Sequence, residues 1–376
     1  MIGTHSILAP SSAERAVPCP ASVTMEQRFP EGEQTPEALE GEAAHWVVAE
    51  MLQGREHPVG TRTPQGLFVT VEMIEGAGIM ADDVDVELQP FGMTAESGSI
   101  ESSVAIPRTH ELCHGTPDYR NWLPTAPRPT LLLYDYKFGH RHVEAFENWQ
   151  LMDYVSGGVS ATRLQDREVD VICKIVQPRA FHRDGPVRTW RFNAADIRAH
   201  VNIRHMAAIE ALGPNPRAMS GPHCRDCRAR HACEAFGRSV YAAMDYAGKA
   251  LPMEMRPEAM GVELVMIDSA LKRLEARKTG LQQQIESTIK QGRAVPHWSL
   301  EAGKGRERWT APDATVIAIG AALGVNVAKP PEALTPKQAA KAGLPLHAMP
   351  TLVETPRTAL ALVRDDGSKA RRVFAP

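Results

Sequence analysis

The 376-residue chain has no long hydrophobic run, since no stretch approaches the roughly 20 uninterrupted apolar residues of a membrane-spanning helix. Residues 1–10 also lack the basic and then apolar segments of a secretory signal. No charge predominates, because 42 Lys and Arg nearly balance 45 Asp and Glu. We therefore expect a cytoplasmic globular protein without a membrane partner, in which any nucleic-acid contact comes from a local basic patch.

Cysteine is scarce as well, with six residues in the whole chain. In a compartment that keeps thiols reduced, so few cysteines do not indicate a disulfide framework. Three of them nevertheless lie between Cys224 and Cys233 with the spacing C-x2-C-x5-C, and Cys19 is a remote fourth candidate. Four sulfur ligands suit either zinc or a 4Fe-4S cluster, and residue chemistry alone does not choose between them.

The pattern of apolar residues predicts an α/β fold. Helices are expected from near Pro36 and over about 146–157, 194–212 and 257–291, and strands over about 102–106, 116–123, 130–138 and 168–176. This order favours a mixed sheet flanked by helices, with the last two strands parallel through a right-handed crossover. We expect one domain over residues 1–245 and a C-terminal extension over 250–376, with a long exposed helix, a hairpin at 297–309 and a small tail domain.

Two acidic positions and a lysine carry the most chemical information. The apolar strand near 130–138 contains Asp135-Tyr136-Lys137, and Gly115-Thr-Pro-Asp118 precedes it. Alternation along a strand places Asp135 and Lys137 on one face. Magnesium or manganese would accept both carboxylates and the Tyr136 carbonyl as ligands, and Lys137 would hold or polarise the attacking water, which indicates phosphodiester hydrolysis. The alternative is a surface ion pair at a strand end, because a D-x-K tripeptide alone is a weak signal.

Residues on two helices extend this pattern. Gln150 and Tyr154, four positions apart, share one face of the helix that follows the strand. His45 lies on the helix that begins near Pro36, where it is either an additional ligand or an ordinary histidine of an amphipathic helix. Glu42, three residues earlier, is a possible substitute that is equally compatible with solvent exposure.

The series Gly-x-x-Asp, then Asp-x-Lys at the end of an apolar strand, then Gln-x-x-x-Tyr resembles the active site of RecB-like nucleases of the PD-(D/E)XK type, which have a restriction-endonuclease-like core. The resemblance implies that Asp118, Asp135 and His45 are metal ligands and that Lys137 is the catalytic lysine. It also implies that Gln150 and Tyr154 orient DNA or the lysine. One departure is the aspartate at position 135, where the family often has the longer glutamate.

The cysteine spacing resembles the iron-sulfur branch of the same nucleases, which includes CRISPR-associated exonucleases and AddB-type helicase-nucleases. These have one cysteine before the nuclease core and C-x2-C-x5-C after it, which implies a 4Fe-4S cluster held by Cys19, Cys224, Cys227 and Cys233. Cys113 and Cys173 fall outside the pattern and are expected to be buried.

Over residues 5 to 240 the resemblance is closest to phage-encoded proteins. It implies an exonuclease on DNA ends, with single strands involved, and a phage recombinase or single-strand-binding protein as a possible partner. A non-catalytic DNA-binding or assembly subunit with the same fold is the alternative.

Basic residues with aromatic neighbours give candidate DNA contacts. One group comprises Arg225, Arg228, Arg230 and Arg238 together with residues 181–183 and 188–191, and a second comprises basic and tryptophan residues of 298–309. Arginines at this density are also ordinary on a protein surface.

Overall fold

The computed structural model describes residues 6–29, 34–180, 182, 185–247, 256–300, 317–319 and 322. The chain divides into two compact units, residues 1–300 and 301–376. The boundary falls at residue 300 rather than at 245–250, because the long helix α8 (Pro257–Lys290) packs on the short helices η6 (Pro222–Asp226) and η7 (Arg228–His231). Most of the expected hairpin and all but a few residues of the tail lie outside the described residues.

The main sheet has five strands in the order β1-β4-β5-β6-β7. Its strands are β1 (Ser99–Ile100), β4 (Tyr119–Leu123), β5 (Thr130–Tyr136), β6 (Asp170–Val176) and β7 (Val187–Asn193). β5 and β6 are parallel, whereas the other neighbouring pairs are antiparallel. The expected parallel pairing of these two strands is thus confirmed. A separate hairpin-like pair is formed by β2 (Val104–Ala105) and β3 (His114–Gly115).

The other α-helices are α1 (Ala13–Ala16), α2 (Ala21–Glu26), α3 (Pro36–Leu52), α4 (Val71–Leu88), α5 (Trp149–Ser160), α6 (Arg198–Leu212) and α7 (Glu234–Ala247). The remaining 3-10 helices are η1 (Pro10–Ser12), η2 (Gln89–Phe91), η3 (Ala95–Ser97), η4 (Asp166–Glu168) and η5 (Ala194–Ile197). No helix in the described part of the chain is long and apolar enough to cross a membrane.

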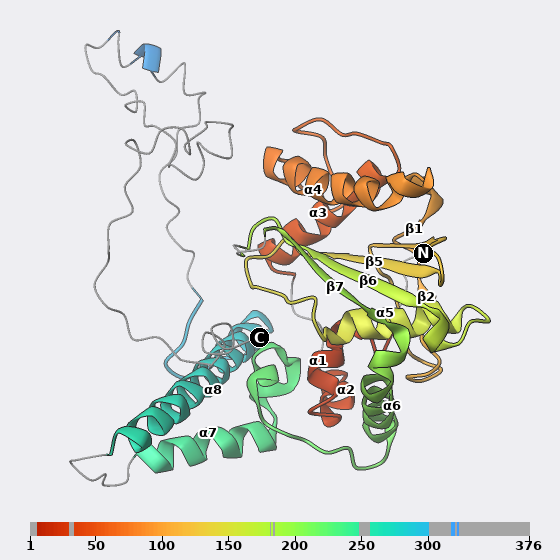
Figure 1. Cartoon of the computed structure of the whole chain (residues 1–376). Coiled ribbons are helices and arrows are strands. Elements are labelled where there is room, and N and C mark those ends of the chain that lie inside the picture. Colours follow the sequence, from red (N-terminus) through yellow and green to blue (C-terminus); the bar gives the residue numbers. More distant parts are fainter. Residues whose placement is uncertain are drawn as a thin grey trace. The chain divides into compact units, whose positions relative to one another are not determined.

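Helices cover both faces of the sheet, α3 and α4 on one and α5 and α6 on the other (Figure 1). Strand β5 is buried along its whole length, as expected for a central strand covered on both faces. Leu132 and Tyr134 enter the core beneath α3 and α4, whereas Leu131 and Leu133 enter the core beneath α5 and α6. The sheet and its helices therefore form the expected α/β layers.

A buried ion pair ties the chain start to α5 and α6. Arg204 is 1% exposed; its Nε donates to Asp153 Oδ2 at 3.0 Å and its Nη2 to the Leu8 carbonyl at 2.9 Å. Thr109 Oγ1 donates to the other oxygen of Asp153 at 3.1 Å. The pair thus joins four segments that are distant in sequence.

Replacing Arg204 with alanine should lower the free energy of unfolding by about 3–5 kcal/mol, because it leaves the Asp153 carboxylate buried without its counter-ion. Chemical denaturation monitored by circular dichroism measures the change. The matched control is Arg198→Ala, which removes a largely exposed arginine paired with Asp166 and should cost about 1 kcal/mol or less. Equal losses in the two variants would contradict the structural role of Arg204.

Candidate active site

Two neighbouring strands bring the acidic residues together. Asp118 immediately precedes β4, and Asp135 lies near the end of β5, which pairs with β4 so that Tyr119 faces Tyr134. The Tyr136 main-chain N–H donates to Asp118 Oδ2 at 2.6 Å. Asp118 is 7% exposed and Asp135 3%. Two nearly buried carboxylates therefore lie at the same end of this strand pair, as the sequence predicts.

Helix α3 brings His45 to this end of the sheet. Its first turn is capped by Thr35, whose Oγ1 accepts from the Ala38 N–H, and the proline at position 36 suits the first helical position. His45 Nδ1 lies 2.7 Å from Asp118 Oδ1, and its ring packs edge-on against the Tyr136 ring. His45 therefore lies beside Asp118, where the sequence series predicts a histidine.

Glu101 is a member of the site that sequence reasoning missed. Ligand atoms of His45, Glu101 and Asp118 all lie within 4.8 Å of one another. Glu101 has a backbone φ of 45°, in the left-handed region that non-glycine residues rarely adopt, and its N–H donates to the Asp118 carbonyl. Glu42, by contrast, is exposed and accepts a hydrogen bond from Gln34. Glu101 is therefore the carboxylate beside His45.

Lys137 and Gln150 form the second half of the site. Lys137 Nζ lies 2.9 Å from Asp135 Oδ2 and donates to Gln150 Oε1 at 3.2 Å. Gln150 Nε2 donates to Asp135 Oδ1 at 2.9 Å and lies 3.2 Å from the Tyr154 hydroxyl. Asn148 starts α5 by accepting from the N–H groups of Gln150 and Leu151, which fixes the helix beneath the strand end. All the residues of the sequence series thus meet in one place.

Negative charge is concentrated around Asp118. Burial and the nearby Asp118 carboxylate raise the pKa of Glu101 to about 7. Burial acts to lower the pKa of His45, but Asp118 outweighs it and raises that pKa to about 9. Burial raises the pKa of Asp135, although Lys137 partly opposes this. A cation bound between neighbouring carboxylates would reduce the electrostatic repulsion between them.

The donor set fits a hard divalent ion. Asp135 Oδ2 is buried and accepts no hydrogen bond of acceptable geometry, despite the short distance to Lys137 Nζ. The ligand atoms that lie within 4.8 Å of one another are two carboxylates, Asp118 and Glu101, and the His45 imidazole, and such an oxygen-rich set suits magnesium or manganese. The Tyr136 main-chain N–H donates to Asp118. That the Tyr136 carbonyl is a metal ligand stays a prediction.

No disulfide joins the four cysteines of the sequence pattern. Cys19, between α1 and α2, is buried together with Cys224 and Cys227, and Cys233 is half-buried. Main-chain N–H groups of Met219 and Gly221 point at the sulfurs of Cys19 and Cys224, both at 3.4 Å. Burial raises the pKa of all three buried thiols, that of Cys227 to about 12. Buried sulfurs that receive main-chain N–H groups fit metal-bound thiolates.

The spacing of these sulfurs bears on the kind of metal. Around one tetrahedral zinc ion, thiolates bound at about 2.3 Å lie about 3.8 Å apart. Among the described residues, no three cysteine, histidine or acidic side chains that include a cysteine have ligand atoms within 4.8 Å of one another. Charges on Cys19 and Cys233 nevertheless influence the pKa of Cys224, so the thiols share one neighbourhood.

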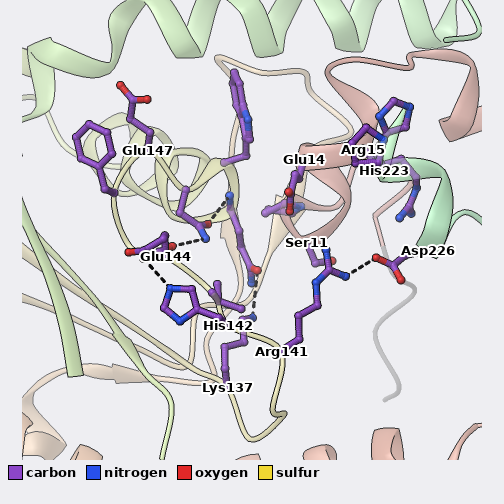
Figure 2. Close-up of a pocket in the computed structure, with 17 residues that line it drawn as sticks. Ser11, Glu14, Arg15, Lys137, Arg141, His142, Glu144, Glu147, His223 and Asp226 are labelled. Atoms are coloured by element: carbon purple, nitrogen blue, oxygen red, sulfur yellow. Dashed lines mark hydrogen bonds and ion pairs between the residues drawn. The ribbon is translucent and has the colours of Figure 1, made fainter. Parts of the chain in front are cut away.

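A cavity of about 670 Å³ opens beside Lys137 and Gln150 (Figure 2). One side comes from the loop between β5 and α5, including Arg141, His142 and Glu144. The other comes from residues 10–15 and from residues of η6, the helix that carries Cys224. Arg141 pairs with Asp226 at 2.5 Å and so links the two sides. The cavity therefore connects the strand-end residues with the cysteine-bearing segment.

Some expected DNA contacts are not available on the surface. Arg230 is 9% exposed and is bonded to Gln283 and the Cys227 carbonyl, and Arg188, within β7, is 4% exposed and donates to Gln177. These two predictions were wrong, because both side chains are packed inside the fold. Arg225 is exposed, whereas Phe181, Arg183 and most of the 298–309 patch lie outside the described residues.

A family model described as protein of unknown function (DUF2800) matches residues 5–344. The chain therefore belongs to this family.

Proposed function

We propose that this DUF2800-family chain is a divalent-metal-dependent deoxyribonuclease of the RecB-like PD-(D/E)XK type, acting on DNA ends. One observation carries the proposal: His45, Asp118 and the Asp135–Lys137 pair, which come from three separate segments of the chain, converge at one end of β4 and β5. The mixed sheet with two helical layers would then be a restriction-endonuclease-like core.

The chemistry follows from the donor groups. A magnesium or manganese ion bound by Asp118, Asp135 and His45 would lower the pKa of a water molecule and neutralise charge on the scissile phosphate. Burial acts to lower the pKa of Lys137, but the ion pair with Asp135 and the charge of Asp118 outweigh it and raise that pKa, so Nζ stays protonated. Lys137 therefore acts as a hydrogen-bond donor that orients the water or a phosphate oxygen, rather than as a general base.

Gln150 and Tyr154 act as positioning residues. Gln150 contacts both Lys137 and Asp135, and Tyr154 donates to the Thr116 carbonyl at 3.1 Å while receiving Gln150 Nε2. This chain of hydrogen bonds holds the lysine at the end of β5. A lysine held by two partners loses less freedom when the transition state forms.

The adjoining cavity is suited to a single strand. Lys137, Arg141 and Arg15 supply positive charge along it, and Phe146, which is 62% exposed, offers a ring on which a base can stack. Acidic residues also line it, so phosphate contacts would be few. We infer an exonuclease that threads one strand past Lys137, and a phage recombinase or single-strand-binding protein remains its proposed partner.

The decisive assay uses the purified full-length chain with end-labelled single-stranded and double-stranded DNA. With manganese or magnesium we expect progressive shortening from an end, and with excess chelator none. Covalently closed circular DNA should resist digestion. DNA binding without cleavage under every metal condition would instead support a non-catalytic binding or assembly subunit, the second candidate that shares this fold.

A 4Fe-4S cluster on Cys19, Cys224, Cys227 and Cys233 belongs to the same proposal. It would connect the segment between α1 and α2 to the segment after α6, and thus close a loop that contains the whole sheet. We assign it a structural role, because none of these cysteines lines the cavity beside Lys137.

A further inference from the structure

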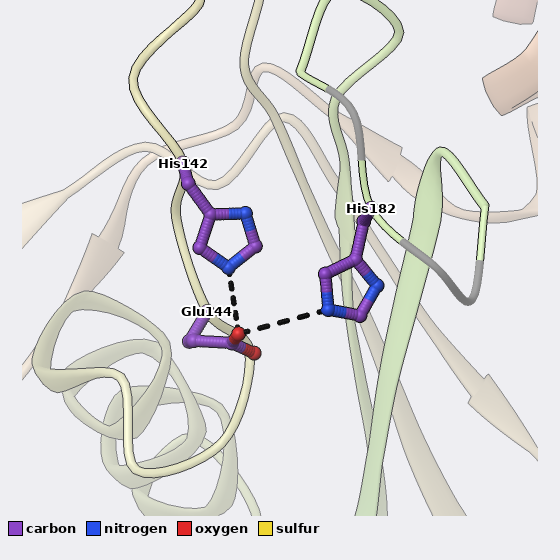
Figure 3. A group of neighbouring side chains, drawn as sticks. All are labelled: His142, Glu144 and His182. Carbon is purple, nitrogen blue, oxygen red and sulfur yellow. Dashed lines mark hydrogen bonds and ion pairs between the residues drawn. The ribbon is translucent and has the colours of Figure 1, made fainter. Parts of the chain in front are cut away.

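Two histidines and a glutamate gather on the loops that follow the parallel strands β5 and β6 (Figure 3). We propose that His142, Glu144 and His182 form a second metal site, which takes a zinc-class divalent ion and is separate from the Asp118 site. The proposal does not depend on nuclease activity, since it rests only on these three side chains and their supports.

The ligand atoms are already close to a coordinating arrangement. Glu144 Oε1 lies 2.6 Å from His142 Nε2 and 3.9 Å from His182 Nε2, and all three ligand atoms lie within 4.8 Å of one another. With metal bonds of about 2.1 Å, tetrahedral ligands lie about 3.4 Å apart. Shifts of about 1 Å in these partly exposed side chains would therefore suffice. The two imidazole rings are stacked, with an angle of 11° between their planes.

One end of the site is held by a buried glutamine. Gln177 is 1% exposed, and its Nε2 donates to the carbonyls of Gly139 and Arg141 at 2.8 and 2.6 Å. Its Oε1 accepts from the Val143 N–H at 3.2 Å and from Arg188. The backbone on both sides of His142 is thus fixed to the end of β6. Ordering of this loop before binding lowers the entropic cost of capturing an ion.

The donor set distinguishes this site from the Asp118 site. Two imidazoles and one carboxylate favour zinc, nickel, cobalt or copper over magnesium, which prefers oxygen ligands. Glu144 is 57% exposed at its side chain and His142 40%, so water can occupy the remaining position. Both residues line the cavity beside Lys137. An ion here would join the β5–α5 loop to the β6–β7 loop at the cavity rim.

Difference titration tests the proposal. Full-length chain from which labile divalent ions have been removed by dialysis, and its His142→Ala/His182→Ala double variant, are titrated with cobalt(II), whose visible absorption reports coordination, and with zinc in competition with a chromophoric chelator. The wild type should bind one equivalent more than the double variant, without a thiolate charge-transfer band for that equivalent. The Glu144→Gln variant should keep the site's shape and weaken that binding at least about tenfold.

His140→Ala is the matched control, because His140 is an exposed histidine of the same loop outside the triad. It should retain the additional equivalent. Equal stoichiometry and affinity in the wild type and the double variant would overturn the proposal, as would loss of the equivalent in the His140 variant. If the double variant unfolds, the affinity of the Glu144→Gln variant for the additional equivalent is the test, and an affinity equal to that of the wild type would overturn the proposal. No DNA is present, so the result is independent of the nuclease assay.

Discussion

Replacing Lys137 with alanine is expected to reduce metal-dependent DNA cleavage by about a thousandfold, while DNA binding changes little. The ammonium group lies between Asp135 and Gln150, where it would face the attacking water, and among the described residues no other lysine lines the same cavity. Its loss removes a donor that acts chiefly in the transition state, so kcat should fall more than KM rises. Initial rates on end-labelled DNA with manganese measure both quantities.

Two comparisons make this result interpretable. Lys272→Ala removes an exposed lysine of α8 and should retain full activity. Asp135→Ala should be at least as inactive as Lys137→Ala, because it removes a proposed metal ligand and the partner of the lysine. Without Lys137, the buried Asp135 carboxylate keeps the hydrogen bond from Gln150 but loses its counter-ion, which could destabilise the variant. Thermal melting in manganese must therefore show that the variant is folded. A folded Lys137 variant with wild-type rates would rule out the proposed mechanism.

Replacing Cys227 with alanine is expected to remove the absorption band at about 400 nm that colours the protein brown, to lower its iron and sulfide content, and to destabilise the chain. A cluster that joins Cys19 to Cys224 closes a loop of about 200 residues, which by loop-closure entropy alone is worth about 5 kcal/mol. Metal-ligand bonds add to this value. Elemental analysis, absorption spectra and denaturant unfolding of the variant and wild type measure the three effects.

Cys113→Ala is the appropriate control, since Cys113 is buried, donates its thiol hydrogen to the Leu8 carbonyl, and lies outside the sequence pattern. It should lose some stability through packing and keep its iron. Wild-type protein with zinc and no iron would replace the iron-sulfur assignment with a zinc site. Wild-type protein that contains neither iron nor zinc would rule out a metal site on these cysteines.

The layers of the fold could be predicted where periodicity is strong. The run that becomes β5 is apolar throughout, and Gln150 and Tyr154 share a helical face, so both elements were predicted with boundaries wrong by only a few residues. Helix α4 was missed, since its window holds Gly76 and Gly78, which weaken a helical signal, and yet it packs against α3. Strand β7 was missed because its mixed basic and aromatic residues resemble a binding surface.

The same contrast applies to the functional residues. Asp118, Asp135 and Lys137 could be found from sequence, because regular strands fix which side chains share a face. Glu101 lies in a turn with positive φ, and no spacing rule connects it to His45. The triad of His142, Glu144 and His182 comes from two loops, and the loop that carries His142 is held by Gln177 through tertiary contacts that sequence pattern does not report.

The cavity beside Lys137 shares a wall with the cysteine-bearing segment, since Pro222, His223 and Asp226 line it and Cys224 lies between them. In the proposed nuclease, substrate passage and retention of the cluster would both depend on the five residues of η6. A substitution in η6 that reshapes the cavity would then also move Cys224, so the two proposed roles would place a double constraint on this segment. The Arg141–Asp226 ion pair extends that constraint to the loop that holds His142.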